Sequence, residues 1–222
     1  MSTTGVDAAA ARTAEVLHEL QELPAVAQAL AGAPHAVLES LPRVLAASDF
    51  IAESCVRDPG VIPALLAGAL HSRRSAADFA AIAAAEGTHT DEATFQAWIR
   101  RWRRREMVRI AWRDLAGWAD LEETLTELSA FADSAIDVAC RFAKAGLTER
   151  FGTPRGPDGA EQPFVVVGMG KLGGGELNFS SDIDLVFLFP EFGDTDGVRS
   201  IANEEFFTRL GRQLIGALAE IT

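Results

Sequence analysis

The chain has 222 residues, 48% of them hydrophobic and 23% charged, which is ordinary for a globular protein of one or two domains. Its net charge of −12 argues against a general nucleic-acid binder, which needs a basic surface. No apolar run reaches the roughly 18 residues of a membrane span, and no secretory signal pattern opens the chain, so we expect no membrane association. Cys55 and Cys140 lack metal-ligand or disulfide spacing, which predicts a cytoplasmic protein.

Residues 1–150 carry a helical pattern almost throughout, rich in alanine and leucine, and we assign them to a helical N-terminal region. Ser48 predicts the start of one helix, and Thr90-Asp91-Glu92 predicts the start of another. A further helix is predicted over residues 121–144. Tryptophans and aliphatic residues recur at helical spacing, which favours core positions for Trp98, Trp102, Trp112 and Trp118.

Arginines crowd the tryptophan-bearing segment: Arg100, Arg101, Arg103, Arg104, Arg105, Arg109 and Arg113. Two interpretations are open. The run can form a surface that docks an acidic partner, or a solvated helix face whose charges pair with the surplus carboxylates of the chain.

The composition changes at residues 151–163, where three prolines and three glycines predict a linker and a domain boundary. Residues 164–222 then carry the first strand patterns, followed by a helix predicted over residues 200–220. Two strands and one helix make a small core. We therefore expect this C-terminal unit to be a fragment of a larger domain.

The stretch from Phe164 to Phe189 predicts a strand, a glycine-rich turn and a second strand. Residues 164–167 and 183–189 are apolar, β-branched runs typical of buried strands. Glycines in the turn allow backbone N–H groups to approach a ligand closely; they are Gly170, Gly173, Gly174 and Gly175.

Asp182 and Asp184 stand at the start of the second predicted strand, where a spacing of two places both side chains on one face. Neighbouring carboxylates repel each other unless a cation lies between them. Beside a glycine turn that can hold phosphate oxygens, they predict a nucleotide–Mg²⁺ site. The alternative is a solvated strand end in which Ser181 and Asp182 close a turn.

Lys171 in the glycine turn can neutralise phosphate charge or simply be exposed. We expect Glu176 and Asn178 to shape the loop. The glycine turn also contains a G-x-G-x-x-G pattern from Gly168, with Glu191 at the distance of a ribose-binding acid. A dinucleotide fold needs an amphipathic helix of about three turns after the glycines. The turn-forming sequence 178–184 leaves no room for one.

The glycine turn, short spacer and paired aspartates resemble the polymerase-beta-type nucleotidyltransferases. More narrowly, residues 168–185 resemble the signature of the bifunctional glutamine synthetase adenylyltransferase/adenylyl-removing family. The flanking segments that agree with this family are 48–50, 103–112 and 206–215. The helical run before the signature resembles the beginning of the half that removes AMP from a tyrosine of adenylylated glutamine synthetase by phosphorolysis, which yields ADP. The other half adds AMP from ATP.

The resemblance implies that Asp182 and Asp184 are the catalytic metal-binding pair. It also implies that Gly173 and Gly174 lie on the phosphate side of the turn, and we count Lys171 and Ser181 as further nucleotide contacts. The implied cofactor is Mg²⁺, with ATP or ADP and inorganic phosphate as substrates or products. The implied partners are glutamine synthetase and a PII-type signalling protein.

In the family a third metal carboxylate lies on a strand after the helix predicted here at residues 200–220. No residue of this sequence matches it, so we expect an incomplete metal site, the third ligand lying beyond Thr222, and little activity of this chain alone. The predicted fold is α+β: a mostly helical region followed by a partial nucleotidyltransferase core. The alternative function is a catalytically incomplete fragment that acts only as a nucleotide-binding or protein-interaction module.

Overall fold

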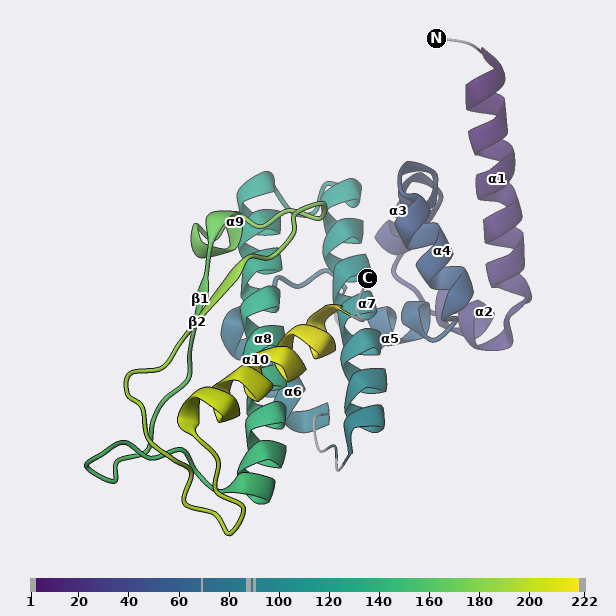
Figure 1. The fold of residues 1–222 in the computed structure, drawn as a ribbon. Coiled ribbons are helices and arrows are strands. Elements are labelled where there is room, and N and C mark those ends of the chain that lie inside the picture. Colours follow the sequence, from purple (N-terminus) through teal and green to yellow (C-terminus); the bar gives the residue numbers. More distant parts are fainter. Residues whose placement is uncertain (1–2, 69, 87–88, 90, 220–222) are drawn as a thin grey trace. The chain divides into compact units, whose positions relative to one another are not determined.

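The computed structural model describes residues 3–68, 70–86, 89 and 91–219 and confirms the predicted α+β class (Figure 1). Helices dominate, and the described residues contain one two-stranded antiparallel sheet. The elements are α1 (Thr3–Glu22), α2 (Pro24–Ala31), α3 (His35–Ala47), α4 (Asp49–Arg57), α5 (Val61–Ala67), α6 (Ala76–Glu86), α7 (Glu92–Ala116), α8 (Leu121–Phe151), β1 (Val165–Gly168), α9 (Gly170–Gly173), β2 (Leu185–Leu188) and α10 (Asn203–Ala219).

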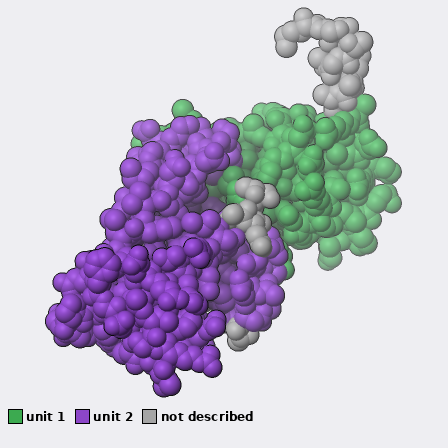
Figure 2. Space-filling model, viewed as in Figure 1, with its two compact units in different colours: residues 1–73, 101–127 green, residues 74–100, 128–222 purple. Residues whose placement is uncertain are grey.

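The chain divides into two compact units, coloured separately in Figure 2. Unit 1 comprises residues 1–73 and 101–127, and unit 2 comprises residues 74–100 and 128–222. The divisions fall inside α7 and α8, whereas the domain boundary at residues 151–163 stays a prediction. Across the described ranges, none of the helices is both long and apolar enough to span a bilayer.

Unit 1 has a core of aliphatic side chains from α1 to α5 that pack with the second half of α7. Trp112 is 1% exposed, and its indole Nε1 donates to Ser40 Oγ at 2.9 Å. The predicted start of α4 is confirmed, because Ser48 Oγ accepts a hydrogen bond from the N–H of Ile51 at 3.3 Å. The apolar residues of these helices therefore face the core of unit 1, as their helical spacing predicts.

In unit 2, the start of α7 is also as predicted: Asp91 Oδ1 accepts from the N–H of Thr94 at 2.9 Å. Of the residues in the predicted N-cap, Thr90 lies outside the described residues. Phe95 stacks on Phe142 of α8 with ring centroids 4.0 Å apart. Helix α8 continues to Phe151, seven residues beyond the predicted end, because its apolar repeat goes on and Leu147 and Phe151 are buried.

The two strands are antiparallel, with Val165 opposite Leu188 and Gly168 opposite Leu185. The prediction of buried strands is wrong for one face of the sheet, where Val165, Val186 and Leu188 are 41–52% exposed. One face of this sheet packs on α10 through stacked phenylalanines, among them Phe164 on Phe207 at 5.5 Å. A Cβ atom at Gly211 of α10 would lie 3.1 Å from the ring of Phe187, so glycine allows the helix to approach the sheet closely. Helix α10 covers residues 203–219 of the predicted 200–220; Glu220 lies outside the described residues.

The segment predicted as a linker is packed against the loop that precedes α10. Asp196 accepts from the N–H of Thr153 at 2.7 Å and forms an ion pair with Arg155 at 2.8 Å. Asn203 Nδ2 donates to the carbonyl oxygen of Arg155 at 2.8 Å. These contacts hold the chain end of α8 against the start of α10 within unit 2.

Candidate functional site

The glycine turn between β1 and β2 contains one short helical turn, α9, and ends in a Schellman motif. The N–H of Glu176 donates to the carbonyl of Lys171 at 2.8 Å, and the N–H of Gly175 donates to that of Leu172 at 3.0 Å. Gly175 has φ of 71°, the left-handed conformation that this motif needs and glycine adopts without strain. The turn is therefore a defined structure and not a loose loop.

Gly173 and Gly174 differ in the reason for having no side chain. A Cβ atom at Gly173 would lie 2.5 Å from the carbonyl oxygen of Gly168, so the backbone of β1 excludes a side chain there. At Gly174 the nearest heavy atom would be 3.6 Å away, an ordinary contact. Gly173 is thus required by the packing of the turn, whereas Gly174 is exposed and has room for a small side chain on the protein side.

The backbone N–H groups from Gly173 to Glu176 each donate to a carbonyl oxygen of the same turn. Gly173 donates to Met169 at 3.2 Å, and Gly174 donates to Gly170 at 3.1 Å. In this conformation these amides already donate within the turn and do not point to a ligand as free donors. Close approach of a ligand to the exposed glycine backbone stays possible without them.

Asp182 and Asp184 are both exposed and lie just before β2, which begins at Leu185 and not at Ile183 as predicted. The carbonyl oxygen of Asp184 accepts from the N–H of Met169 at 2.9 Å, which continues the register of the two strands by one pair. By alternation, Asp184 belongs to the face of Val186, the face opposite Phe187 and α10. No strand is assigned at Asp182, so a shared direction of the two carboxylates stays a prediction.

The other predicted contacts surround this strand end. Lys171 is exposed on α9. Ser181 is half-buried, and its hydroxyl donates to Asn178 Oδ1, as does that of Ser180 at 3.4 Å. The expected loop-shaping role of Asn178 is confirmed, and the Ser181 hydroxyl stabilises the bend that leads to Asp182.

Sequence reasoning missed a contact that holds this turn from outside the hairpin. Leu177 follows the Schellman motif, and its backbone N–H donates to Ser129 Oγ of α8 at 3.0 Å. Both residues are buried, at 6% and 5% exposure. The sequence does show a serine on the apolar side of a predicted helix, which indicates a buried hydroxyl with a hydrogen-bond partner. That partner lies 48 residues away and could not be inferred.

The burial of two arginines on α7 is the second feature that sequence reasoning missed. Arg109 is fully buried; its Nε donates to Glu106 at 2.8 Å and its Nη2 donates to Glu127 of α8 at 2.5 Å. Arg113 is 3% exposed and pairs with Glu127 at 3.0 Å and Glu123 at 2.6 Å. For these two arginines the expected pairing with carboxylates is confirmed. The exposed docking surface and the solvated helix face are both wrong for them, because both side chains are buried within unit 1.

Potential metal ligands are few among the described residues of this strand end. Across the described ranges, no three or more His, Cys, Asp or Glu side chains are grouped so as to hold a metal ion. The pair Asp182 and Asp184 supplies hard oxygen ligands of the kind that Mg²⁺ prefers, and both are accessible to solvent. Two carboxylates fit one part of a Mg²⁺ coordination shell, whose other positions water and phosphate usually take.

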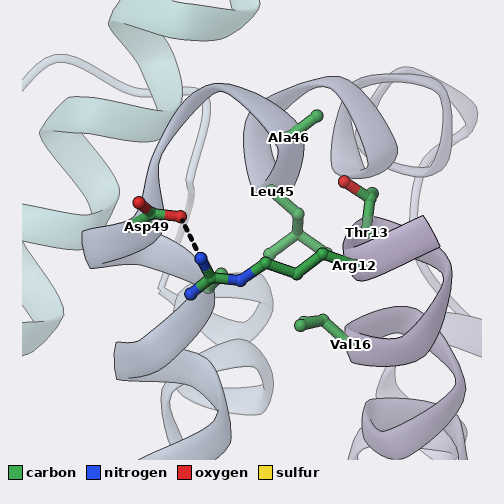
Figure 3. A pocket seen from close by; sticks show the side chains of 7 residues that line it. Arg12, Thr13, Val16, Leu45, Ala46 and Asp49 are labelled. Atoms are coloured by element: carbon green, nitrogen blue, oxygen red, sulfur yellow. Dashed lines mark ion pairs between the residues drawn. The ribbon is translucent and has the colours of Figure 1, made fainter. Parts of the chain in front are cut away.

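A separate pocket of about 390 Å³ lies within unit 1 among α1, α3 and α4 (Figure 3). Arg12 and Asp49 form an ion pair across it at 3.1 Å, and Val16 and Leu45 supply apolar walls. The side chains of this pair are 55% and 76% exposed. Such a solvent-screened pair contributes little to stability or to binding by itself.

The antiparallel strands and the four-residue α9 exclude the dinucleotide-binding interpretation, which requires parallel strands joined by a long helix. The class defined by fold and site is a mostly helical α+β protein with exposed carboxylates beside a glycine turn. Residues 38–222 match the family described as glutamate-ammonia ligase adenylyltransferase. The chain belongs to this family, which confirms the resemblance seen in the sequence.

Curated relatives agree. The protein named bifunctional glutamine synthetase adenylyltransferase/adenylyl-removing enzyme from Pseudomonas aeruginosa is 47% identical over 193 residues, 85% of this chain and 20% of the relative. Its namesake from Thioalkalivibrio sulfidiphilus is 45% identical over 83% of this chain and 19% of the relative. That from Nitrosomonas europaea is 51% identical over 60% of this chain and 14% of the relative. The chain thus spans about a fifth of the length of the first two relatives.

Proposed function

We propose that the chain contributes part of a nucleotidyltransferase site that acts on glutamine synthetase, and specifically the part that removes AMP. Family membership and the names of the relatives support adenylyl transfer as the general activity. The division into removal and addition rests on the resemblance of the helical run and signature to the adenylyl-removing half.

One observation carries the location of the site. The hydrogen bond from Met169 N–H to the carbonyl of Asp184 brings the beginning of the glycine turn and the acidic segment to the same end of the sheet. Lys171, Gly174, Asp182 and Asp184 are all exposed there. A polyphosphate near this end would meet a cationic side chain, a backbone without side chains and two potential metal ligands.

Asp182 and Asp184 would hold Mg²⁺, which when bound neutralises phosphate charge and orients the reacting groups. Lys171 adds a positive charge next to the glycines. The missing side chain at Gly174 leaves space for phosphate oxygens beside the turn. The Ser181 hydroxyl donates to Asn178 and so stabilises the bend before Asp182. We also propose that this hydroxyl contacts the nucleotide directly.

In the proposed reaction an oxygen of inorganic phosphate forms a bond to the phosphorus of the tyrosine-linked AMP. The bond between this phosphorus and the tyrosine oxygen breaks. The products are ADP and the tyrosine hydroxyl, which takes up a proton. The protein contributes positioning and charge neutralisation and forms no covalent intermediate in this scheme.

Calorimetric titration of the chain with ADP, with and without Mg²⁺, tests the proposal. Binding should depend on Mg²⁺ and should be lost in Asp184→Asn and Asp182→Asn. Asp137→Asn is the matched control, because Asp137 is an exposed carboxylate on α8 whose recorded partner is Arg141. In an enzyme of full family length, the same two variants should stop the release of ADP from adenylylated glutamine synthetase; a normal rate in either would refute the assignment.

The alternative is a module that binds nucleotide or protein without catalysing transfer. Among the described residues, no three or more His, Cys, Asp or Glu side chains are grouped so as to hold a metal ion. This favours the binding module for this chain by itself. Mg²⁺-dependent ADP binding without any ADP release from adenylylated glutamine synthetase would support a binding module. Regulation by a PII-type signalling protein, and a cytoplasmic location, stay predictions.

A further inference from the structure

The segment from α9 to β2 is held in unit 2 by buried groups on both sides of its exposed part. Leu172 is 5% exposed and Leu177 is 6% exposed, whereas the residues between them, Gly173 to Glu176, are exposed. Figure 1 shows α9 beside α8, and the hydrogen bond from Leu177 N–H to Ser129 Oγ joins the segment that follows α9 to α8. The turn is thus fixed to a helix outside the hairpin.

Helix propensity alone does not favour a serine at position 129 of α8. The helix is a continuous run from Leu121 to Phe151, and alanine has a higher helix propensity than serine at an interior position. The Ser129 hydroxyl instead supplies an acceptor to a buried N–H group that leaves the Schellman motif. A buried N–H without an acceptor is unfavourable, so this contact selects one path for the chain after Glu176.

The position of Leu177 determines the positions of the residues that follow it, up to Asp182. Only the short bend centred on Asn178 separates Leu177 from Asp182, and the carbonyl of Asp184 is fixed to Met169. The distance between the glycine backbone and the carboxylates therefore depends on the anchor at one end and on the strand register at the other.

We propose that Ser129 is a positioning residue: its hydroxyl fixes Leu177 and through it the spacing between the glycine turn and Asp182. This proposal rests on the proposed function, because the ligand whose binding depends on that spacing is the Mg²⁺–nucleotide. The role differs from general support of the fold, because the hydrogen bond from Leu177 acts directly on the loop that leads to Asp182.

The experiment compares Ser129→Ala, Ser129→Thr and Ser134→Ala in the full 222-residue chain. Ser134 is the matched control, since it lies on the same helix at 9% exposure and its hydroxyl donates to Ala130 within the helix at 2.9 Å. Two quantities are measured: amide hydrogen exchange of peptides covering residues 170–184, and calorimetric affinity for Mg²⁺–ADP. Thermal unfolding confirms that each variant is folded.

Ser129→Ala should speed exchange in the turn and weaken Mg²⁺–ADP binding by up to about tenfold. This is the lower end of the effect of removing a hydrogen-bond partner of a metal ligand, because Ser129 acts on Asp182 only through Leu177. Ser134→Ala should change neither, and Ser129→Thr, which keeps a hydroxyl acceptor, should restore both. Unchanged exchange or unchanged affinity in Ser129→Ala overturns the role of Ser129 alone. Absence of Mg²⁺–ADP binding in the unsubstituted chain overturns the proposed function, and the positioning role with it.

Discussion

Charged groups have opposite surroundings in two regions of this molecule. On α7 and the start of α8, Arg109 and Glu127 are fully buried and paired with each other. Before β2, Asp182 and Asp184 are exposed on a short segment next to glycines. Burial of a charge is costly unless a partner compensates it, so the first set has become part of the core. The second set has kept its access to solvent, as a ligand site requires.

The comparison shows that abundance of charge does not indicate function. The arginine-rich run is the most conspicuous charged feature of the sequence, yet two of its arginines are buried and ion-paired inside unit 1. The proposed site contains far fewer charges. It is distinguished by carboxylates that are accessible to solvent and by the neighbouring glycine turn. Three changes test this contrast.

The largest expected effect comes from breaking the buried network. Glu127→Ala leaves Arg109 and Arg113 without their shared carboxylate in the interior, and removal of one partner of a buried ion pair costs about 3–5 kcal/mol of unfolding free energy. Urea denaturation followed by tryptophan fluorescence measures it. Asp137→Ala is the control: it breaks a pair whose side chains are 62% and 65% exposed, and such pairs contribute at most about 1 kcal/mol. Similar losses in both variants would contradict the contrast.

A smaller effect separates the two central glycines of the turn. Gly173→Ala places a Cβ atom 2.5 Å from the carbonyl oxygen of Gly168, and overpacking of this kind costs about 1–3 kcal/mol. Gly174→Ala meets nothing closer than 3.6 Å and should leave the melting temperature unchanged. If Gly174 faces the nucleotide, the same change should weaken Mg²⁺–ADP binding. A melting temperature that falls equally in both variants would argue against the assigned packing.

The smallest effect concerns an exposed pair and its dependence on pH. The hydrogen bond from Arg155, together with the N–H of Thr153, lowers the pKa of Asp196 below its ordinary value of 3.8. A lowered folded-state pKa means that the stabilisation is present above about pH 4 and is lost as the pH falls through the folded-state pKa. Asp196→Asn should flatten the fall in stability below about pH 4, measured by urea denaturation at several pH values. An acid limb identical to that of the parent chain would count against this contact.

Local signals in the sequence predicted much of the fold. Ser48 and Asp91 begin helices α4 and α7 with side chains that accept from backbone N–H groups, as their types indicated. The tryptophan spacing placed Trp98, Trp102 and Trp112 in the core, where they are at most 5% exposed. The fourth predicted core residue, Trp118, is only half-buried and packs against the core. The glycine turn between two strands was also predicted, with strand ends off by one to two residues, because glycine content and β-branched runs act locally.

Other features of the site could not be predicted because they depend on residues distant in the chain. The partner of Arg109 on α8 is 18 residues away, and Ser129 and Leu177 are 48 residues apart. Helical spacing shows which residues share a face but not which face another helix covers. For the same reason, the roles of Gly173 and Gly174 looked alike in the sequence and differ in the structure.

The amino-acid sequence by itself determined the family, the helical character of residues 1–150 and the pairing of a glycine turn with two aspartates, because these follow from side-chain type and spacing along the chain. Only the tertiary structure decided that Arg109 and Arg113 are interior, that Gly173 is required by packing, and that Ser129 holds the turn. Burial and hydrogen bonding between distant segments exist only once helices and strands have packed, since each needs both partners in place.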